Sequence, residues 1–318
     1  MKRHSKKQKH KLPHPAPLNA LEHARPGGIS TFMRLPHISD PEELDIALVG
    51  IPFDGGTTYR PGARFGPRQV RDQSVLIRPW NPELQINPFA KYRIADFGDF
   101  PVNPLSIEDT FRRVEEHMEP LMNASTRCAA VGGDHSLSLP LLRATAKKFG
   151  PVAVIQFDAH NDLWDEYFGC KLSHGTPFRR AIEEGLIREN GFLQVGLRGQ
   201  VYGEEDFDFA RKHKVSMITA EEFHAGGIKA FHRHLDGFRG KPVYITLDID
   251  CVDPAYAPGT GTPQVGGFTS AQMLELVRAL RGLKIVGCDL VEVSPPYDNG
   301  SITSLLAANL LYELLCVF

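Results

Sequence analysis

The chain has 318 residues, a formal net charge of −2 and 42% hydrophobic residues, which is typical of a soluble globular protein. Neither the net charge nor any apolar run indicates nucleic acid or a membrane as a partner. Five scattered cysteines form no CxxC pair, which favours a reduced cytoplasmic location. Residues 1–27 begin with a strongly basic stretch and lack the apolar core of a signal peptide. We expect them to form a disordered tail, with an electrostatic contact to a partner subunit as the alternative.

From residue 28 to residue 318, apolar runs alternate with helical patterns, and Pro and Gly mark most of the boundaries. The expected strands are Asp45–Gly50, Tyr92–Ala95, Cys128–Val131, Val152–Phe157, Phe192–Val195, Val215–Ile218, Val243–Leu247 and Ile285–Val291. The expected helices lie near Pro67–Ile77, Ile107–Asn123, Leu137–Phe149, Pro177–Glu184, Glu204–His213, Ala220–Ala225, Ser270–Leu280 and Thr303–Cys316. This alternation predicts one α/β domain, built from βα units around a mostly parallel sheet that is buried on both faces.

Short polar motifs follow most of these strands. They are Asp54-Gly-Gly-Thr-Thr58, Gly132-Gly-Asp-His135, Asp158 to Asp162, Gly196-Leu-Arg-Gly199, Asp248 to Asp250 and Glu292-Val-Ser-Pro-Pro296. Open α/β sheets bind ligands at the carboxyl ends of their strands. The motifs therefore predict a single site at that edge of the sheet.

Three of the motifs carry carboxylates or imidazoles, and two of them, Asp158 to Asp162 and Asp248 to Asp250, have the strand spacing that places residues i, i+2 and i+4 on one side. Carboxylates packed this closely repel one another unless cations lie between them, and the number of ligands indicates two ions. Oxygen-rich sites with one imidazole per ion suit Mn²⁺, Ni²⁺, Co²⁺ or Fe²⁺ better than a thiolate-bound Zn²⁺. The candidate ligands are His135, Asp158, His160, Asp162, Asp248 and Asp250.

Two ions about 3.5 Å apart can share a bridging hydroxide, which is a strong nucleophile at neutral pH. With the four Asp ligands and this hydroxide the cluster carries about −1, a charge that suits a cationic substrate. A lone Asp-x-Asp or Gly-Gly-Asp-His is often only a turn or a helix cap, but a buried Asp-x-His-x-Asp without a cation is costly. We interpret Asp134 as a supporting or capping residue, because beside His135 it would point away from the ions.

From about Gly28 to its C-terminus the chain resembles the ureohydrolase family, which includes arginase and agmatinase. The resemblance rests on Gly132-Gly-Asp-His-Ser136, Phe157-Asp-Ala-His-Asn-Asp162, Ser173-His-Gly-Thr-Pro-Phe178, the run from Asp248 to Pro263, and Glu292-Val-Ser-Pro-Pro-Tyr-Asp298. It implies a three-layer α/β/α arginase-like fold with a mostly parallel eight-stranded sheet. It also implies a homo-oligomer, a trimer or a hexamer, with a hetero-oligomer that contains a paralogous subunit as the alternative. It also implies a binuclear Mn²⁺ or Ni²⁺ centre that hydrolyses a guanidino C–N bond, releasing an amine and urea or a substituted urea.

The resemblance also implies roles for single residues. One ion would be held by His135, Asp158, Asp162 and Asp248, and the other by Asp158, His160, Asp248 and Asp250. Asp250 would hold the hydroxide and then move its proton. His174 matches a mobile histidine that passes a proton to the leaving amine, with a helix-capping loop histidine as the alternative. Glu292 matches the carboxylate that pairs with the guanidinium, with a surface salt bridge as its alternative.

The chain is most similar to the guanidinobutyrase and guanidinopropionase branch, for example in Phe32-Met-Arg-Leu-Pro36 and Thr176–Gly185. Arginases and guanidinobutyrases carry an Asn where this chain has Trp164, and Asn161 replaces a small residue; both are candidate substrate contacts, unless the change is neutral. Indole offers one donor and an apolar face that can stack on a cation or an alkyl group. Hydrolysis of guanidine, or of an alkyl biguanide such as metformin to guanylurea and dimethylamine, is therefore an alternative to guanidinobutyrase- or agmatinase-like activity.

Two readings from other classes stay open. One is a deacetylase with a single Zn²⁺ on the same fold, although one ion would leave several carboxylates uncompensated. The other is a non-catalytic subunit of a hetero-oligomer, although every ligand position is retained in this chain.

In the Asp250–Pro254 segment we expect Asp253 to form an Asx turn rather than to bind metal.

Overall fold

The computed structural model describes residues 14–318, so residues 1–13 of the predicted tail lie outside this range. Within the described chain, eight strands form one sheet in the order β2-β1-β3-β8-β7-β4-β5-β6, and every neighbouring pair is parallel. The strands are β1 Ile46–Ile51, β2 Ile94–Asp99, β3 Arg127–Gly132, β4 Val152–Phe157, β5 Ile187–Leu197, β6 Ser216–Thr219, β7 Pro242–Asp248 and β8 Lys284–Val291. The eight predicted strands are therefore confirmed.

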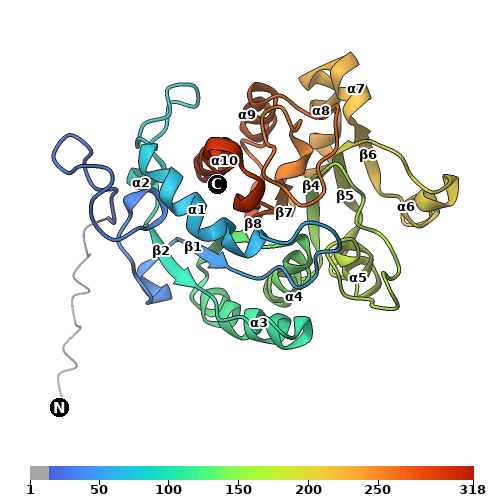
Figure 1. Ribbon diagram of the computed structural model, residues 1–318, viewed down its shortest axis with the longest axis horizontal. Coiled ribbons are helices and arrows are strands. Elements are labelled where there is room, and N and C mark those ends of the chain that lie inside the picture. Colours follow the sequence, from blue (N-terminus) through green and yellow to red (C-terminus); the bar gives the residue numbers. More distant parts are fainter. Residues whose placement is uncertain (1–13) are drawn as a thin grey trace, which may run out of the picture.

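Helices cover both faces of this sheet, so the predicted three-layer α/β/α architecture is confirmed (Figure 1). The layer that buries Val70, Phe231 and Leu311 against the sheet contains α1 Gly66–Gln73, α8 Ile228–Leu235, α9 Ser270–Ala279 and α10 Ile302–Val317. The layer that buries Phe111 and Phe178 contains α3 Ile107–Ala124, α4 Ser138–Phe149, α5 Pro177–Glu183 and α6 Asp208–Lys212. Two short helices, α2 Pro88–Lys91 and α7 Ala220–Gly226, complete the set.

Side-chain caps mark the beginnings of α2, α3, α7 and α9. Helix α3 begins after Ser106, whose side chain accepts a hydrogen bond from the Asp109 N–H, and it ends at Ser125 in the left-handed conformation. Helix α8 was not predicted. Its apolar face is short and is interrupted by the basic run His232-Arg-His234, yet Ala230, Phe231 and Leu235 are buried. The helix expected over Glu204–His213 is instead a 3-10 turn followed by α6.

The expectation that no apolar run is long enough to span a bilayer is wrong for the segment that contains helix α10. In the described chain, Asn299–Val317 is long and apolar enough to do so, with a mean hydropathy of 1.5. However, 72% of that window is buried inside the protein, and α10 packs between α1 and α9. It therefore has the surroundings of a core helix.

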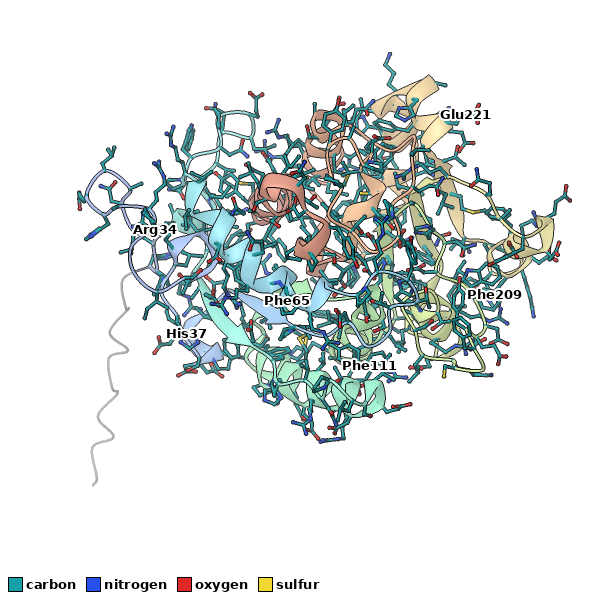
Figure 2. All side chains as sticks on the ribbon, in the orientation of Figure 1. Arg34, His37, Phe65, Phe111, Phe209 and Glu221 are labelled. Carbon is teal, nitrogen blue, oxygen red and sulfur yellow. The ribbon has the colours of Figure 1, made fainter. Side chains whose placement is uncertain are left out.

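The strand order explains how the predicted motifs can meet. Strands β3, β8, β7 and β4 are consecutive neighbours in the middle of the sheet, although they are far apart in the sequence. Being parallel, they all direct their carboxyl ends to the same edge. The flanks lie far from this centre: Figure 2 shows Arg34 and His37 at one end of the molecule and Phe209 and Glu221 at the other.

Candidate active site

The predicted metal ligands gather at the carboxyl ends of the central strands. His135 begins a 3-10 turn just after β3, and Asp158 follows the last residue of β4. Asp248 is the last residue of β7, and Asp250 lies in the 3-10 turn that follows. All of these side chains are buried, so the sheet brings together groups that could not share this space without compensation.

Three carboxylates surround the imidazole of His135. Its Nδ1 lies 3.1 Å from Asp158 Oδ2, 3.1 Å from Asp162 Oδ2 and 3.2 Å from Asp248 Oδ2. This buried Nδ1 has no well-aligned hydrogen-bond partner among the described residues. The His135 nitrogen and the oxygens of Asp158 and Asp162 lie within 4.8 Å of one another, and with the nearby Asp248 oxygen they offer a donor set that fits a divalent cation.

A second group forms around His160. Its Nδ1 lies 3.0 Å from Asp250 Oδ2 and 3.5 Å from Asp158 Oδ1. Asp158 therefore directs one oxygen to each group, as expected for a bridging ligand. Among the described residues, Asp248 lies within 4 Å of one imidazole nitrogen only, the Nδ1 of His135, and it approaches it through Oδ2. Its Oδ1 accepts a hydrogen bond from the Asp250 N–H. Its bridging role stays a prediction.

Burial and mutual repulsion shift the pKa values of the carboxylates in the cluster, and bound cations would compensate for both effects. Burial and the charge of Asp158 raise the pKa of Asp162 to about 6. Burial, Asp250 and Asp158 raise the pKa of Asp248 well above its usual range. Burial disfavours a charged His135, but its close contacts with the three surrounding carboxylates raise its pKa well above the ordinary value. Without cations the cluster binds protons, and metal entry would displace them.

Two residues of the site have a backbone that L-residues rarely adopt. Asp162 has φ 51° and Glu292 has φ 64°. The Glu292 N–H is held by a hydrogen bond to the Gly133 carbonyl, with a length of 2.8 Å. Conformations of this kind cost free energy and persist at functional sites, where the surrounding structure holds them in place.

Glu292 and His174 form a pair beside the cluster. Glu292 Oε1 accepts a hydrogen bond of 2.9 Å from the His135 N–H and lies 3.3 Å from His174 Nδ1. Burial opposes charge on His174, but Glu292 raises its pKa to about 9. Glu292 Oε2 is buried and accepts no hydrogen bond in the described chain. A Cβ on Gly261 would lie 3.4 Å from it, so the glycine keeps this approach open.

Trp164 lines a cavity of about 760 Å³ that also contains His160. The indole centroid lies 5.8 Å from the ring of Tyr167 and 5.6 Å from the ring of Tyr202, both in edge-to-face geometry. Asn161 also lines this cavity, but its side chain accepts from the Leu163 N–H and donates to the Asp206 carbonyl. It therefore braces the loop, and its substrate contact stays a prediction.

Comparison with known proteins agrees with this geometry. The model of the arginase family matches residues 44–316. This chain belongs to the arginase family. It is 47% identical to the guanidinobutyrase of Pseudomonas aeruginosa, over 95% of this chain and 96% of that protein. It is 48% identical to the guanidinopropionase of the same organism, over 96% of each chain. The structure of proclavaminate amidinohydrolase from Streptomyces clavuligerus aligns with a TM-score of 0.86 at 42% identity, covering 93% of this chain and 100% of that one.

The family membership confirms the predicted fold and reaction class. This arginase-family chain is a hydrolase of guanidino C–N bonds, and its His/Asp cluster suits the binuclear metal dependence of the family. The relatives do not favour the two alternative substrates, guanidine and an alkyl biguanide, or a non-catalytic subunit. The single-Zn²⁺ deacetylase reading also loses its support, because the carboxylates form two groups rather than one.

Several supporting residues of this arginase-family site were missed or only partly understood from the sequence. Arg198 donates to the carbonyls of Asp250, Cys251, Val252 and Gln264, and thus holds the loop after β7. Thr58 places its hydroxyl 2.7 Å from His174 Nε2. Both lie in motifs noted at strand ends, but their contacts are with distant segments that no local pattern shows.

The two aspartates interpreted as structural do have structural contacts. Asp134 accepts hydrogen bonds from the N–H groups of Ser136 and Gly56, at 3.0 Å and 2.7 Å. Asp253 accepts from the Ala255 N–H, which makes the expected Asx turn, and also from the Gly266 N–H. The first joins the loop after β1 to the loop after β3, and the second closes the loop that carries Gly261.

Proposed function

We propose that this chain hydrolyses a short linear ω-guanidino acid of the guanidinobutyrate or guanidinopropionate kind, releasing urea and an ω-amino acid. The observation that carries the proposal is the buried, unpaired Oε2 of Glu292 beside the histidine and aspartate cluster. A buried carboxylate oxygen without a donor is costly, and a guanidinium offers N–H groups in the geometry that a carboxylate accepts.

The cluster residues would hold two divalent cations. We assign one ion to His135, Asp158, Asp162 and Asp248, and the other to Asp158, His160, Asp248 and Asp250. When bound, the ions supply Lewis acidity and activate water for attack on the guanidinium carbon. The oxygen-rich donor set suits Mn²⁺, with Ni²⁺ as the alternative.

The side chains around the cluster have distinct tasks in this proposal. Glu292 binds and orients the guanidinium through Oε2. Asp250 Oδ2, 3.0 Å from His160, accepts the proton of the attacking water. His174, held between Glu292 and Thr58, passes a proton to the leaving amine. A protonated His174 is available for this step at neutral pH, because its pKa is raised to about 9.

The cavity around Trp164 suits the tail of such a substrate. The methylene groups would lie against the indole, and the cavity also contains Arg211 and Glu222. Glu222 is occupied with the cap of α7, where it accepts from the Thr219 N–H at 2.8 Å. Arg211 uses only Nη2 for Asp208 and the Glu204 carbonyl. Arg198 and Arg211 outnumber Glu222, the one acid of this lining, so the cavity wall carries a net positive charge, which favours a carboxylate over the ammonium of agmatine.

A substrate panel on protein reconstituted separately with Mn²⁺ and Ni²⁺ tests the proposal. The panel contains 3-guanidinopropionate, 4-guanidinobutyrate, agmatine, guanidine and metformin, and urea and amine products are measured. We expect the highest kcat/KM for one of the two guanidino acids. A higher kcat/KM for agmatine, guanidine or metformin would contradict the proposed substrate class.

We also propose a cytoplasmic homo-oligomer, either a trimer or a hexamer. All five cysteines are free, and four of them are buried, which suits a reducing compartment. Light scattering coupled to size-exclusion chromatography distinguishes these assemblies from a monomer or from a requirement for a paralogous subunit.

A further inference from the structure

A chain of polar groups lies behind His135, on the side away from the three carboxylates. His135 Nε2 lies 2.8 Å from Thr246 Oγ1, and the Thr246 hydroxyl donates to Asp289 Oδ1 over 2.6 Å. His135, Thr246 and Asp289 are all fully buried. Thr246 on β7 and Asp289 on β8 are register neighbours in the sheet. The two strands therefore fix this contact.

Asp289 is saturated by hydroxyl donors. Besides Thr246, it accepts from the Tyr244 hydroxyl at 2.7 Å and from the Ser138 hydroxyl at 2.9 Å, both on Oδ2. Asp289 forms no ion pair with Lys or Arg in the part of the chain that the structure describes. Burying a carboxylate without a cationic partner costs free energy, which indicates that Asp289 has a specific role.

The charge of Asp289 determines which group donates in each hydrogen bond between His135, Thr246 and Asp289. An ionised carboxylate only accepts, so the Thr246 proton is directed at Asp289. The Thr246 oxygen can then accept from the His135 Nε2–H. With its proton on Nε2, the neutral imidazole presents the lone pair of Nδ1 to the three carboxylates. This is the tautomer that a cation at that point requires.

His160 lacks this support. Its imidazole is 39% exposed and lines the substrate cavity, and its Nε2 has no hydrogen-bond partner in the described chain. The two imidazoles of the cluster thus differ. One is supported at Nε2 by a hydroxyl and a buried carboxylate, and the other has no such support at its Nε2. This difference predicts that the two cation sites differ in affinity.

We infer that Thr246 and Asp289 are positioning residues that fix the tautomer and orientation of His135 and thereby make its cation site the tighter of the two. The inference rests on the metal centre of the proposed function. Supporting contacts of this kind raise the basicity of a histidine ligand, and their removal typically costs about 10–100-fold in metal affinity.

The test compares Thr246→Val, which keeps the shape but removes the hydroxyl, with Thr246→Ser, which keeps the hydroxyl. Metal-free protein is titrated with Mn²⁺ by calorimetry, and bound metal is counted after equilibrium dialysis. We expect wild-type protein to bind one ion more tightly than the other. Thr246→Val should lose about 10–100-fold in affinity at the tighter step only, whereas Thr246→Ser should stay within a few fold of wild type.

Tyr244→Phe is a matched control, because it removes a donor to Asp289 and leaves the contact between Thr246 and His135 in place. Melting temperatures of the metal-free proteins separate a folding defect from a metal-binding defect. Unchanged affinity of a folded Thr246→Val variant would overturn the inference, and so would an equal loss in Thr246→Ser. If Thr246→Val loses the tighter step but wild-type protein hydrolyses no guanidino acid, the inference holds and the proposed substrate fails.

Discussion

Replacement of Glu292 by Gln tests the guanidinium contact most directly. Oε1 of Glu292 accepts from the His135 N–H at 2.9 Å, so the amide oxygen of a glutamine must take this position. The amide nitrogen then occupies the position of Oε2, where it presents N–H groups to the N–H groups of the substrate. The substitution therefore removes a charge-assisted contact and also places two donors against each other.

The size of the effect follows from these contacts. A hydrogen bond to a charged group contributes about 1.5–3 kcal/mol. Loss of one or two such bonds at Oε2 corresponds to about 1.5–6 kcal/mol, and the middle of this range, about 3–4 kcal/mol, is about 10²–10³-fold in kcat/KM. The contact with His174 at 3.3 Å also loses its charge, so we expect kcat to fall together with kcat/KM.

Urea release measured over a range of guanidino acid concentrations gives both constants. Glu166→Gln makes the same chemical change on an exposed side chain of the Trp164 loop and should leave both constants unchanged. Metal content is measured for each variant, because Glu292 also contacts the backbone of His135. A Glu292→Gln enzyme with wild-type metal content and kcat/KM within threefold of wild type would refute the reasoning.

Three further results are expected. Asp158→Asn removes the carboxylate that faces both His135 and His160, so bound metal should fall and activity should drop at least about 10³-fold; full activity with two bound ions would contradict the binuclear assignment. Trp164→Ala removes the indole against which we propose that the substrate tail lies, so KM for guanidinobutyrate should rise about tenfold with little change in kcat. Because Asp162, with its pKa near 6, and the raised Asp248 and His135 must lose protons on metal entry, calorimetry should show tighter Mn²⁺ binding at pH 8 than at pH 6; equal affinity would contradict this coupling.

The sequence indicates the strands better than the helices. Buried parallel strands are mostly apolar runs, such as Ile46–Ile51, and Gly or Pro often marks their ends. Helix α8 is not predicted from its own residues, because its apolar pattern is short and is interrupted by basic residues. Its burial depends on contacts with the sheet and with α9. The order of the strands cannot be read locally, because it is set by contacts between segments far apart in the chain.

The cluster itself was predictable from motifs that follow the strands, but the expected strand geometry was wrong, because β4 ends at Phe157, Asp162 has φ 51°, and His160 joins a different group from Asp162. The free oxygen of Glu292 was not predictable, since only the folded chain shows which of its oxygens the His135 N–H occupies. The same holds for the cavity around Trp164, whose walls come from Tyr167 and from Tyr202 on a different loop.

A signal for the missed supporting residues does exist inside the apolar strands. Gln156 stands two residues before Asp158 and donates to its Oδ2 at 2.7 Å, while Thr246 stands two residues before Asp248. Residues two apart on a strand face the same side, so a buried polar residue at this spacing lies directly beneath a ligand. Each has a polar register neighbour, Gln194 for Gln156 and Asp289 for Thr246. A second polar layer under the cluster is thus encoded by spacing, but its cross-strand pairs become visible only once the strand order is known.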